Sequence, residues 1–99
     1  MSKLKKGIPS ENKGYDYIFF CPGCNHTHGF MTEGNVVWQF NGDMEYPTVL
    51  PSILYSFTFF EQPKHICHSF IEKGNIRFLT DCTHKLAGKT VELPEIEII

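Results

Sequence analysis

Hydrophobic and polar residues alternate over short runs of this chain, and no stretch keeps the 3.6-residue apolar spacing of an amphipathic helix. Runs rich in aromatic and β-branched residues predict strands, because these side chains pack well on a pleated surface. The predicted extended segments are 15–21, two within 29–43, 46–60, 65–71, 76–80 and a last edge strand within 90–99 that is broken at Pro94. The pattern therefore predicts a mostly β fold, a small antiparallel sheet with at most one short helical turn.

Turn-forming residues separate these segments. The Gly-Asn pair at 34–35 predicts a hairpin. Pro47 and Pro51 predict that the first half of segment 46–60 stays out of a central ladder position, because proline has no amide donor. The stretch DCTHKLAG (81–88) predicts the helical turn, since it begins with an aspartate that can cap a helix and ends with a glycine that can stop one.

Residues 1–14 contain Gly, Pro, Ser and Lys without strand alternation, so we expect a flexible leader followed by a single domain over 15–99. A chain of 99 residues buries a core of modest size, which a bound metal would reinforce. No apolar segment is long enough to cross a membrane, and no apolar run typical of a secretory signal follows the first lysines. We therefore expect a cytoplasmic protein, in which thiols stay reduced.

Composition and charge narrow the functional classes. Hydrophobic residues make up 41% of the chain and aromatic residues 14%, which excludes a disordered protein. The formal net charge is −2, whereas a nucleic-acid-binding protein usually carries a basic surplus. The lysines at positions 3, 5 and 6 form the only basic run, and we expect them to be a solvated tail.

The motif CPGC places Cys21 and Cys24 on either side of a Pro-Gly pair. At this spacing both thiolates can bind one tetrahedral metal ion, and the turn leaves amides free to hydrogen-bond to sulfur. A thioredoxin-like redox pair needs a helix that starts at the motif, and the following residues, NHTHGF, are poor helix formers. Two unrelated buried thiols are the remaining alternative. In a cytoplasmic chain with four cysteines, metal binding is the favoured interpretation.

Cys67 and Cys82 belong to a predicted hairpin whose register brings them together. If a two-residue turn forms at 74–75, Cys67 faces Cys82 across the hairpin. The same register makes Glu72 and Arg77 an opposite-charge pair. Directly opposed Cβ atoms are about 4.5–5.5 Å apart, so both sulfurs can reach one ion. A three-residue loop would shift the pairing by one residue and change this result.

The sequence thus predicts one Zn²⁺ in a zinc knuckle that stabilises the domain. The predicted ligands are Cys21, Cys24, Cys67 and Cys82, with His28, His68 and His84 as alternates. Four thiolates would close the site, whereas a histidine-rich site would leave a position for water.

A second polar cluster is predicted on the opposite side of the same hairpin. There His68 faces Asp81, an arrangement found in catalytic sites and also as an ordinary structural hydrogen bond. His84 lies two residues past Cys82 and can turn toward either cluster. If the protein is an enzyme, the predicted catalytic residues are His68, Asp81 and His84.

Three segments of the chain carry a resemblance to a known family: CPGCNHTH, WQFNGDMEYPTVLPSIL and CHSFIEKGNIRFLTDCTHKLAGKTVELP. They resemble an uncharacterised family of small bacteriophage and prophage proteins that are often labelled ammonia monooxygenase. The matching positions are Cys21, Cys24, His28, Cys67, His68, Asp81, Cys82 and His84. The monooxygenase label does not fit, because that enzyme is a membrane complex. A similarity to domains found beside bacterial ubiquitin-like conjugation genes implies a peptidase role.

Three functions are compatible with these observations. We expect a zinc-stabilised binding module, encoded by a phage or prophage and acting in the host cytoplasm on a host or phage protein. The alternative is a zinc-dependent, peptidase-like hydrolase that uses His68, Asp81 and His84 beside an open metal position. A zinc-ribbon-like nucleic-acid reader is the third, and the acidic net charge argues against it.

Overall fold

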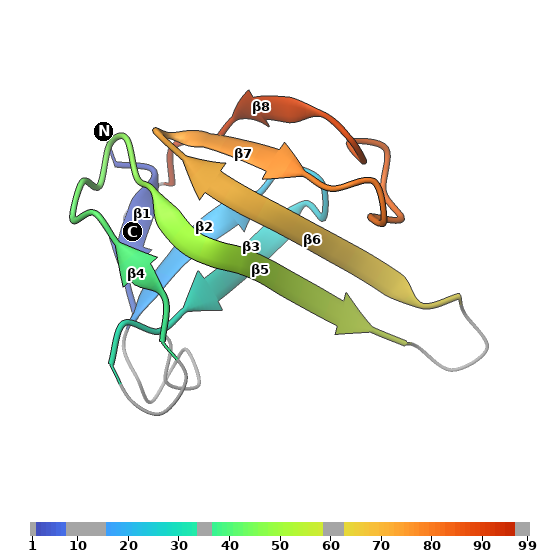
Figure 1. Cartoon of the computed structure of the whole chain (residues 1–99), viewed down its shortest axis with the longest axis horizontal. Coiled ribbons are helices and arrows are strands. Elements are labelled where there is room, and N and C mark those ends of the chain that lie inside the picture. The colour runs from blue at the N-terminus through green and yellow to red at the C-terminus, as the bar shows by residue number, and fades with distance from the viewer. Residues whose placement is uncertain (1, 8–15, 34–36, 59–62, 97–99) are drawn as a thin grey trace.

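The computed structural model describes residues 2–7, 16–33, 37–58 and 63–96 of the chain. These residues form eight strands and no helix, so the predicted β fold is confirmed (Figure 1). The strands are β1 (Leu4–Lys6), β2 (Tyr17–Cys21), β3 (His26–Phe30), β4 (Gln39–Phe40), β5 (Val49–Phe57), β6 (His65–Glu72), β7 (Asn75–Phe78) and β8 (Thr90–Glu92).

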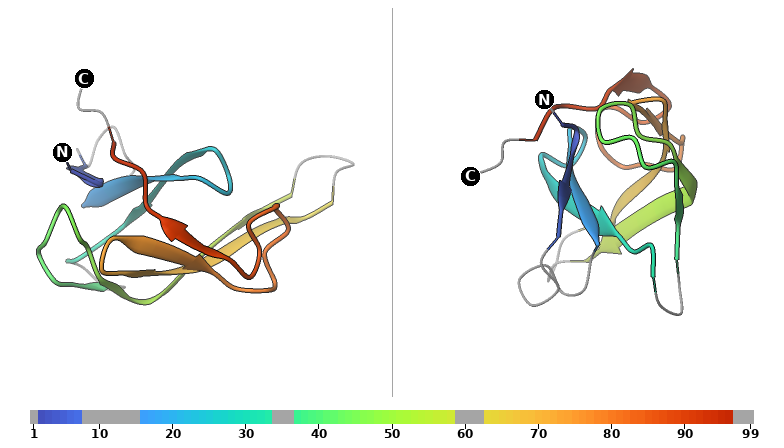
Figure 2. Two further views of the ribbon diagram at one scale, coloured as in Figure 1. Left: turned by 90° about the horizontal axis from the view of Figure 1, so that it is seen from above. Right: turned by 90° about the vertical axis from the view of Figure 1, so that its left-hand side faces the viewer.

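The strands form two antiparallel sheets, one with the order β1-β2-β3 and one with the order β4-β5-β6-β7-β8. The three-stranded sheet covers one face of the five-stranded sheet, so the molecule has two layers (Figure 2). β5 and β6 are the longest strands, with 9 and 8 residues, and they run together across the three-stranded sheet (Figure 1). We call the face of the five-stranded sheet that turns away from β1–β3 the outer face.

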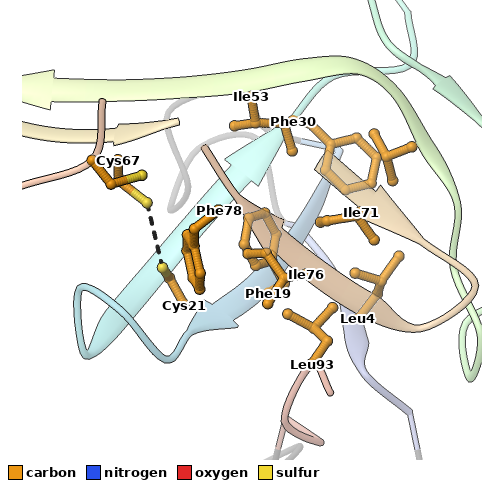
Figure 3. Close-up of a cluster of buried hydrophobic side chains, with 12 residues drawn as sticks. Leu4, Phe19, Cys21, Phe30, Ile53, Cys67, Ile71, Ile76, Phe78 and Leu93 are labelled. Atoms are coloured by element: carbon orange, nitrogen blue, oxygen red, sulfur yellow. Dashed lines mark hydrogen bonds between the residues drawn. The ribbon is translucent and has the colours of Figure 1, made fainter. Parts of the chain in front are cut away.

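The core lies between the sheets because strand side chains point alternately to opposite faces. On β6 the buried positions are Cys67, Ser69 and Ile71, and the residues between them are less buried. The larger buried side chains around them are Leu4, Phe19, Phe30, Ile53, Ile76, Phe78 and Leu93 (Figure 3). Each such side chain contributes roughly 1.5–3 kcal/mol through burial. Hydrophobic burial therefore holds the layers together, while β6 also presents a second set of side chains on the outer face.

β5 contains a bulge where its pairing with β6 shifts. The pairs on either side of the bulge are Val49 with Ile71 and Ile53 with Ser69. Three residues of β5 thus lie opposite a single residue of β6. Pro51, which follows a cis peptide bond, is one of these three residues. Proline has no amide donor, and a bulged residue is not required to donate to the ladder, so proline is tolerated here. The expectation that this part of the chain stays out of a central position is wrong, since β5 lies between β4 and β6.

The β6–β7 hairpin turns at Lys73 and Gly74, one residue earlier than predicted. Both residues have positive φ values, 48° and 84°, as a tight type I′ turn requires, and glycine adopts such a value readily. Glu72 therefore faces Asn75, and the predicted register is wrong by two residues. A shift of two residues keeps each side chain on its own face, so the predicted division of the hairpin into two sides is retained.

Two expectations for the first half of the chain also change. Leu4–Lys6, inside the predicted leader, forms β1 because Leu4 is an apolar anchor that becomes fully buried against the core. Residues 8–14 of that leader lie outside the described residues. The two strands expected within 29–43 are β3 and β4, which belong to different sheets and do not pair. The Gly-Asn pair at 34–35 lies outside the described residues.

The last part of the chain forms turns and one edge strand. Residues 81–88 contain turns and no helix. The local backbone bonds there, such as that from Ala87 to His84, span a single turn, and the amide of Thr83 bonds to Ile66 of β6 instead. The predicted edge strand is confirmed as β8, and it ends before Pro94. The amide of Ile96 donates to the carbonyl of Ser2 at 2.9 Å, which joins this end of the chain to β1. Among the described residues, no helix is long and apolar enough to span a membrane.

Candidate active site and metal centre

Three side chains on the outer face form a continuous chain of hydrogen bonds. The Oγ of Ser52 lies 2.9 Å from Nε2 of His68, and Nδ1 of His68 lies 3.1 Å from Oδ2 of Asp81. An ionised carboxylate only accepts hydrogen bonds, so Nδ1 carries the imidazole proton and donates it to Asp81. Nε2 is then unprotonated and accepts the hydroxyl proton of Ser52. The chemistry of the three groups thus fixes the direction of both hydrogen bonds.

Strand alternation and the β5 bulge bring the serine to the histidine. His68 follows the buried Cys67 on β6, points to the outer face and lies opposite Leu54 of β5. Ser52 precedes Leu54 by two residues on the same face and directly follows Pro51 in the bulge. Bulges are common beside active sites because they re-aim a side chain. The bulge therefore sets the direction from which the hydroxyl approaches the imidazole.

Asp81 lies in the segment after β7, which backbone hydrogen bonds hold along β6. The amide of Leu79 donates to the carbonyl of His68, and the amide of Thr83 donates to the carbonyl of Ile66, both at 2.9 Å. Asp81 lies between these two attachment points. Its carboxylate therefore reaches the imidazole although its segment has no regular secondary structure.

The hydrogen-bonded chain is open to solvent on the carboxylate side. The side chain of His68 is 25% exposed and that of Asp81 is 53% exposed. Both border an open hollow of about 500 Å³, whose wall also includes Arg77 and Thr90. The hollow thus leaves room beside the imidazole and the carboxylate, and Ser52 is not among the residues that line it.

Aliphatic side chains flank the serine along β5. Leu50 and Leu54, two residues before and after Ser52, are 43% and 59% exposed. The other exposed large hydrophobic residues of the described ranges are Val37 and Tyr46, and Tyr46 lies beside Gly74. Any substrate that reaches the Ser52 hydroxyl therefore lies against apolar surface.

Four metal-binding side chains converge on the inner side of β6. They are Cys21, Cys24, His28 and Cys67, and their ligand atoms all lie within 4.8 Å of one another. The sulfurs of Cys21 and Cys67 are 3.7 Å apart and point toward each other from the two sheets (Figure 3). Tetrahedral ligands at about 2.3 Å from a zinc ion are roughly 3.8 Å from one another, so this spacing suits a metal. The cluster can hold a metal ion.

The CPGC turn shapes one side of this cluster. Asn25 takes a left-handed conformation, with φ 62°, and its amide donates to the carbonyl of Cys21 at 2.8 Å. The amide of Cys24 approaches the sulfur of Cys21 at 3.4 Å. A Cβ at Gly23 would collide with the imidazole of His84. Glycine is therefore required at this position because a ring packs directly over the backbone.

The protonation of the three thiols is strongly coupled. The pKa of Cys21 is lowered to about 4, chiefly because the Cys67 thiol donates a hydrogen bond to its sulfur. Burial raises the pKa of Cys24 to about 12, and the charge on Cys21 adds to the rise. The pKa of Cys67 is raised well beyond its usual range, because ionisation would break the bond to Cys21 and leave a buried charge. Only a cation would allow all three to ionise together.

The imidazole of His28 is a second, independent indication that the cluster can bind a metal ion. Its side chain is buried, and neither ring nitrogen has a hydrogen-bond partner. A buried polar atom without a partner costs about 1–3 kcal/mol. A metal ion bound to one nitrogen would remove much of that cost. The donor set of three sulfurs and one imidazole fits zinc.

Cys82 and His84 lie at the edge of the sulfur cluster. Their ligand atoms group with that of Cys67 within 4.8 Å. Cys82 does not face Cys67 in the ladder, because β7 ends at Phe78. The ring of His84 packs edge-on against that of Phe78, 4.5 Å between centroids, and burial lowers the pKa of His84. The structure thus places His84 on the sulfur side and outside the hydrogen-bonded chain of the outer face.

Sequence reasoning brought His68 and Asp81 together but did not find Ser52. No local motif marks this serine, which lies in the short sequence PSIL. Ser52 meets the imidazole only when β5 pairs with β6. The length of the loop between these strands does not predict which residues pair. The one usable signal was Pro51, since a proline inside a predicted strand indicates a bulge.

A family model matches residues 2–79 of the chain, and its description is bacterial ubiquitination-like system serine protease (BubE). The matched range contains Ser52 and His68 and ends two residues before Asp81. No curated protein and no solved structure matches the chain.

This match corrects two expectations drawn from the sequence. The resemblance to phage and prophage proteins is wrong as an assignment, because the matching family belongs to bacterial ubiquitination-like systems. The expected binding module is wrong as well, because the family is described as a protease, which agrees better with the hydrolase alternative. The cysteine motifs misled because they describe a metal cluster and say nothing about the serine on the other face of β6. With 78 of 99 residues matched, the chain belongs to the BubE family of serine proteases from bacterial ubiquitination-like systems.

Proposed function

We propose that this protein is a serine protease in which Ser52 is the nucleophile, His68 the general base and Asp81 the group that orients the imidazole. The observation that carries the proposal is the hydrogen-bonded chain of these three side chains, with both links at 3.1 Å or less. Such a chain recurs on unrelated folds and is recognised by its geometry. The family description supports the same chemistry.

Acylation begins when the Ser52 oxygen attacks the carbonyl carbon of the scissile bond. As the O–C bond forms, the hydroxyl proton moves to Nε2 of His68. Asp81, bonded to Nδ1–H, stabilises the resulting imidazolium. The tetrahedral intermediate then collapses, the C–N bond breaks, and the amine leaves with the proton from Nε2. The product is an ester between Ser52 and the acyl half of the substrate.

Deacylation repeats these steps with water as the nucleophile. Nε2 of His68 removes a proton from water as its oxygen adds to the ester carbonyl. Collapse of the second intermediate breaks the ester, and the proton on Nε2 returns to the oxygen of Ser52. The acyl product leaves as a carboxylic acid, and the enzyme recovers its starting protonation state.

The substrate that we propose is a protein of a bacterial ubiquitination-like system, as the family description suggests. The open outer face supports a protein substrate, because Leu50 and Leu54 offer apolar contacts on both sides of the nucleophile. We place the enzyme in the cytoplasm, since its four cysteines are free thiols and such thiols persist in reducing compartments.

The metal in this proposal is a structural Zn²⁺. Its ligands are Cys21, Cys24, Cys67 and His28, which occupy the inner side of β6. The imidazole of His68 points to the outer face, so the ion takes no direct part in peptide hydrolysis. Cys82 was expected as the fourth ligand, but the orphaned nitrogens of His28 favour the imidazole.

Ser52→Ala tests the proposed nucleophile. The variant should fold normally, fail to react with a fluorophosphonate probe and lose roughly 10⁴-fold or more in kcat. Ser56→Ala is the matched control, because Ser56 lies on the same strand and is exposed. It should be labelled and active like the wild type. Normal labelling of Ser52→Ala would refute the assignment. A metallohydrolase would be favoured instead if the wild-type protein is not labelled by the probe and loses its activity as soon as a chelator is added.

A further inference from the structure

The β6–β7 ladder stops just before the proposed general base. Its last pair is Ser69 with Phe78. Leu79, one residue beyond β7 in the same register, lies opposite His68 and donates its amide to the carbonyl of that residue. In an antiparallel ladder a residue directs its N–H and C=O toward the same neighbour. The backbone groups of His68 on this side therefore need partners from outside β7.

The thiol of Cys82 supplies the acceptor that the ladder lacks at the amide of His68. Its sulfur lies 3.1 Å from the backbone nitrogen of His68 and 3.2 Å from the backbone oxygen of the same residue. The Leu79 amide also donates to that oxygen. Cys82 is 8% exposed, so water does not replace these contacts readily. One side chain thus accepts from and donates to a single residue of β6.

Cys82 is also the chain neighbour of Asp81. The same short segment therefore presents a carboxylate to the imidazole and a thiol to the backbone of His68. The segment is thus attached both to the side chain and to the backbone of His68, and these two attachments hold Asp81 at a set distance from the imidazole. Without the thiol, the link from Asp81 to β6 would depend on the backbone bonds of Leu79 and Thr83 and on the Thr83 hydroxyl, which accepts from the amide of Ile66 at 3.0 Å.

We infer that Cys82 is a positioning residue, whose thiol completes the ladder at His68 and holds the imidazole in line with Asp81 and Ser52. The inference rests on the proposed serine protease function. It assigns Cys82 a role in positioning, apart from the proposed metal centre of Cys21, Cys24, His28 and Cys67. The metal centre is then complete without it.

Cys82→Ala and Cys82→Ser separate positioning from folding. Cys82→Ala should retain one zinc per chain and lower kcat roughly 10- to 100-fold with little change in KM, since small misplacements of a catalytic group carry costs of that size. The low-field proton resonance of His68 Nδ1–H should broaden or vanish. Cys82→Ser, whose hydroxyl also donates and accepts, should recover much of kcat and the resonance.

Leu93→Val is the control for a small loss of core packing. Leu93 is fully buried, and its amide bonds to Gly74 at the opposite end of the hairpin. Its kcat and low-field resonance should match those of the wild type. If Cys82→Ala does not fold, Cys82→Ser alone decides the test. The serine hydroxyl still donates and accepts, so the inference expects a loss in kcat of less than roughly 10-fold. A larger loss in Cys82→Ser would count against the inference.

Three results would overturn the positioning role. They are wild-type kcat in Cys82→Ala, loss of zinc from that variant, and an equal loss of kcat in Leu93→Val. Failure of the underlying function looks different. If Ser52→Ala keeps its activity and its fluorophosphonate labelling, the serine mechanism is wrong whatever the Cys82 variants do.

Discussion

Single hydrogen-bonding groups secure the ends of several short strands, and Asp16 is the clearest case. Its carboxylate accepts from the amide of Thr32 at 2.7 Å, from the amide of Glu33 at 3.1 Å and from the Thr32 hydroxyl at 3.2 Å. These bonds lower the pKa of Asp16, with the Thr32 amide as the largest cause. One carboxylate thus joins the start of β2 to the end of β3.

Asp16→Asn should change how stability depends on pH. Because the folded pKa is lower than the ordinary value of 3.8, this carboxylate stabilises the fold above that pH. The stabilisation is lost as pH falls through the folded pKa. Asp16→Asn should therefore melt at lower temperature than the wild type near neutral pH, and the difference should shrink in acid. Thermal melts followed by circular dichroism check this.

Thr32→Val is the control for the Asp16 variant. It removes the hydroxyl donor but keeps both amide donors, so most of the acid dependence should remain. A gap between wild type and Asp16→Asn that stays constant from neutral to acid pH would contradict the expected linkage.

At the scale of strands, β5 combines the proposed nucleophile with exposed aliphatic side chains. Successive residues on one face of a regular strand are about 6.6 Å apart, so Leu54, beyond the bulge, lies within one or two substrate residues of Ser52. Leu50 precedes Ser52 within the bulge itself. Both leucines are already exposed, and their truncation removes little from the core. Their side chains therefore contribute little to folding stability and are available to contact a substrate.

Leu54→Ala should weaken substrate binding without unfolding the protein. We expect an increase in KM equivalent to roughly 1–3 kcal/mol, with kcat close to wild type. Steady-state kinetics on a cleavable protein substrate check this. Tyr46→Ala is the control, because Tyr46 is 61% exposed but lies before β5, beside Gly74. An equal rise in KM for Tyr46→Ala would show that β5 does not provide the substrate contact.

The strands β5 and β6 differ in how much of their structure could be predicted from the sequence. Period-2 alternation predicted β6, and it placed Cys67 and His68 on opposite faces because that property survives a two-residue error in register. The turn at Lys73 was missed, since only the positive φ of a non-glycine residue reveals it. Ser52 was missed because its partner comes from another strand. Long-range pairing and a bulge, both invisible in local spacing, create the proposed active site.

At the scale of the whole molecule, the Cys/His cluster that can hold a metal spans the two sheets. Cys21 lies at the end of β2 in one sheet, and Cys67 lies on β6 in the other. A small domain gains much of its stability from such a link, since the metal is bound only in the folded state. The cluster itself was anticipated from CPGC, whereas the proposed choice of His28 over Cys82 depends on tertiary contacts.

Removal of the metal should therefore destabilise the protein as a whole. Purified protein should contain one zinc per chain, and chelation should lower the melting temperature by roughly 10 °C or more, given several kcal/mol of metal-dependent stability. His28→Ala should weaken zinc retention. His26→Ala, two residues earlier on β3 and outside the four-residue cluster, should keep zinc. Metal-free protein with unchanged stability would contradict the predicted centre.

The alternation of β6 has a consequence for the lengths that natural variants of this chain can have. Cys67 and His68 are adjacent, and each depends on its face of the strand. An insertion or deletion of one codon between the turn at Gly74 and Cys67 would exchange the two faces, sending the imidazole inward and the thiol outward. A single such event would remove the proposed metal ligand and the proposed general base together. Length variation among relatives should therefore be excluded from this strand and collect in the connections between strands.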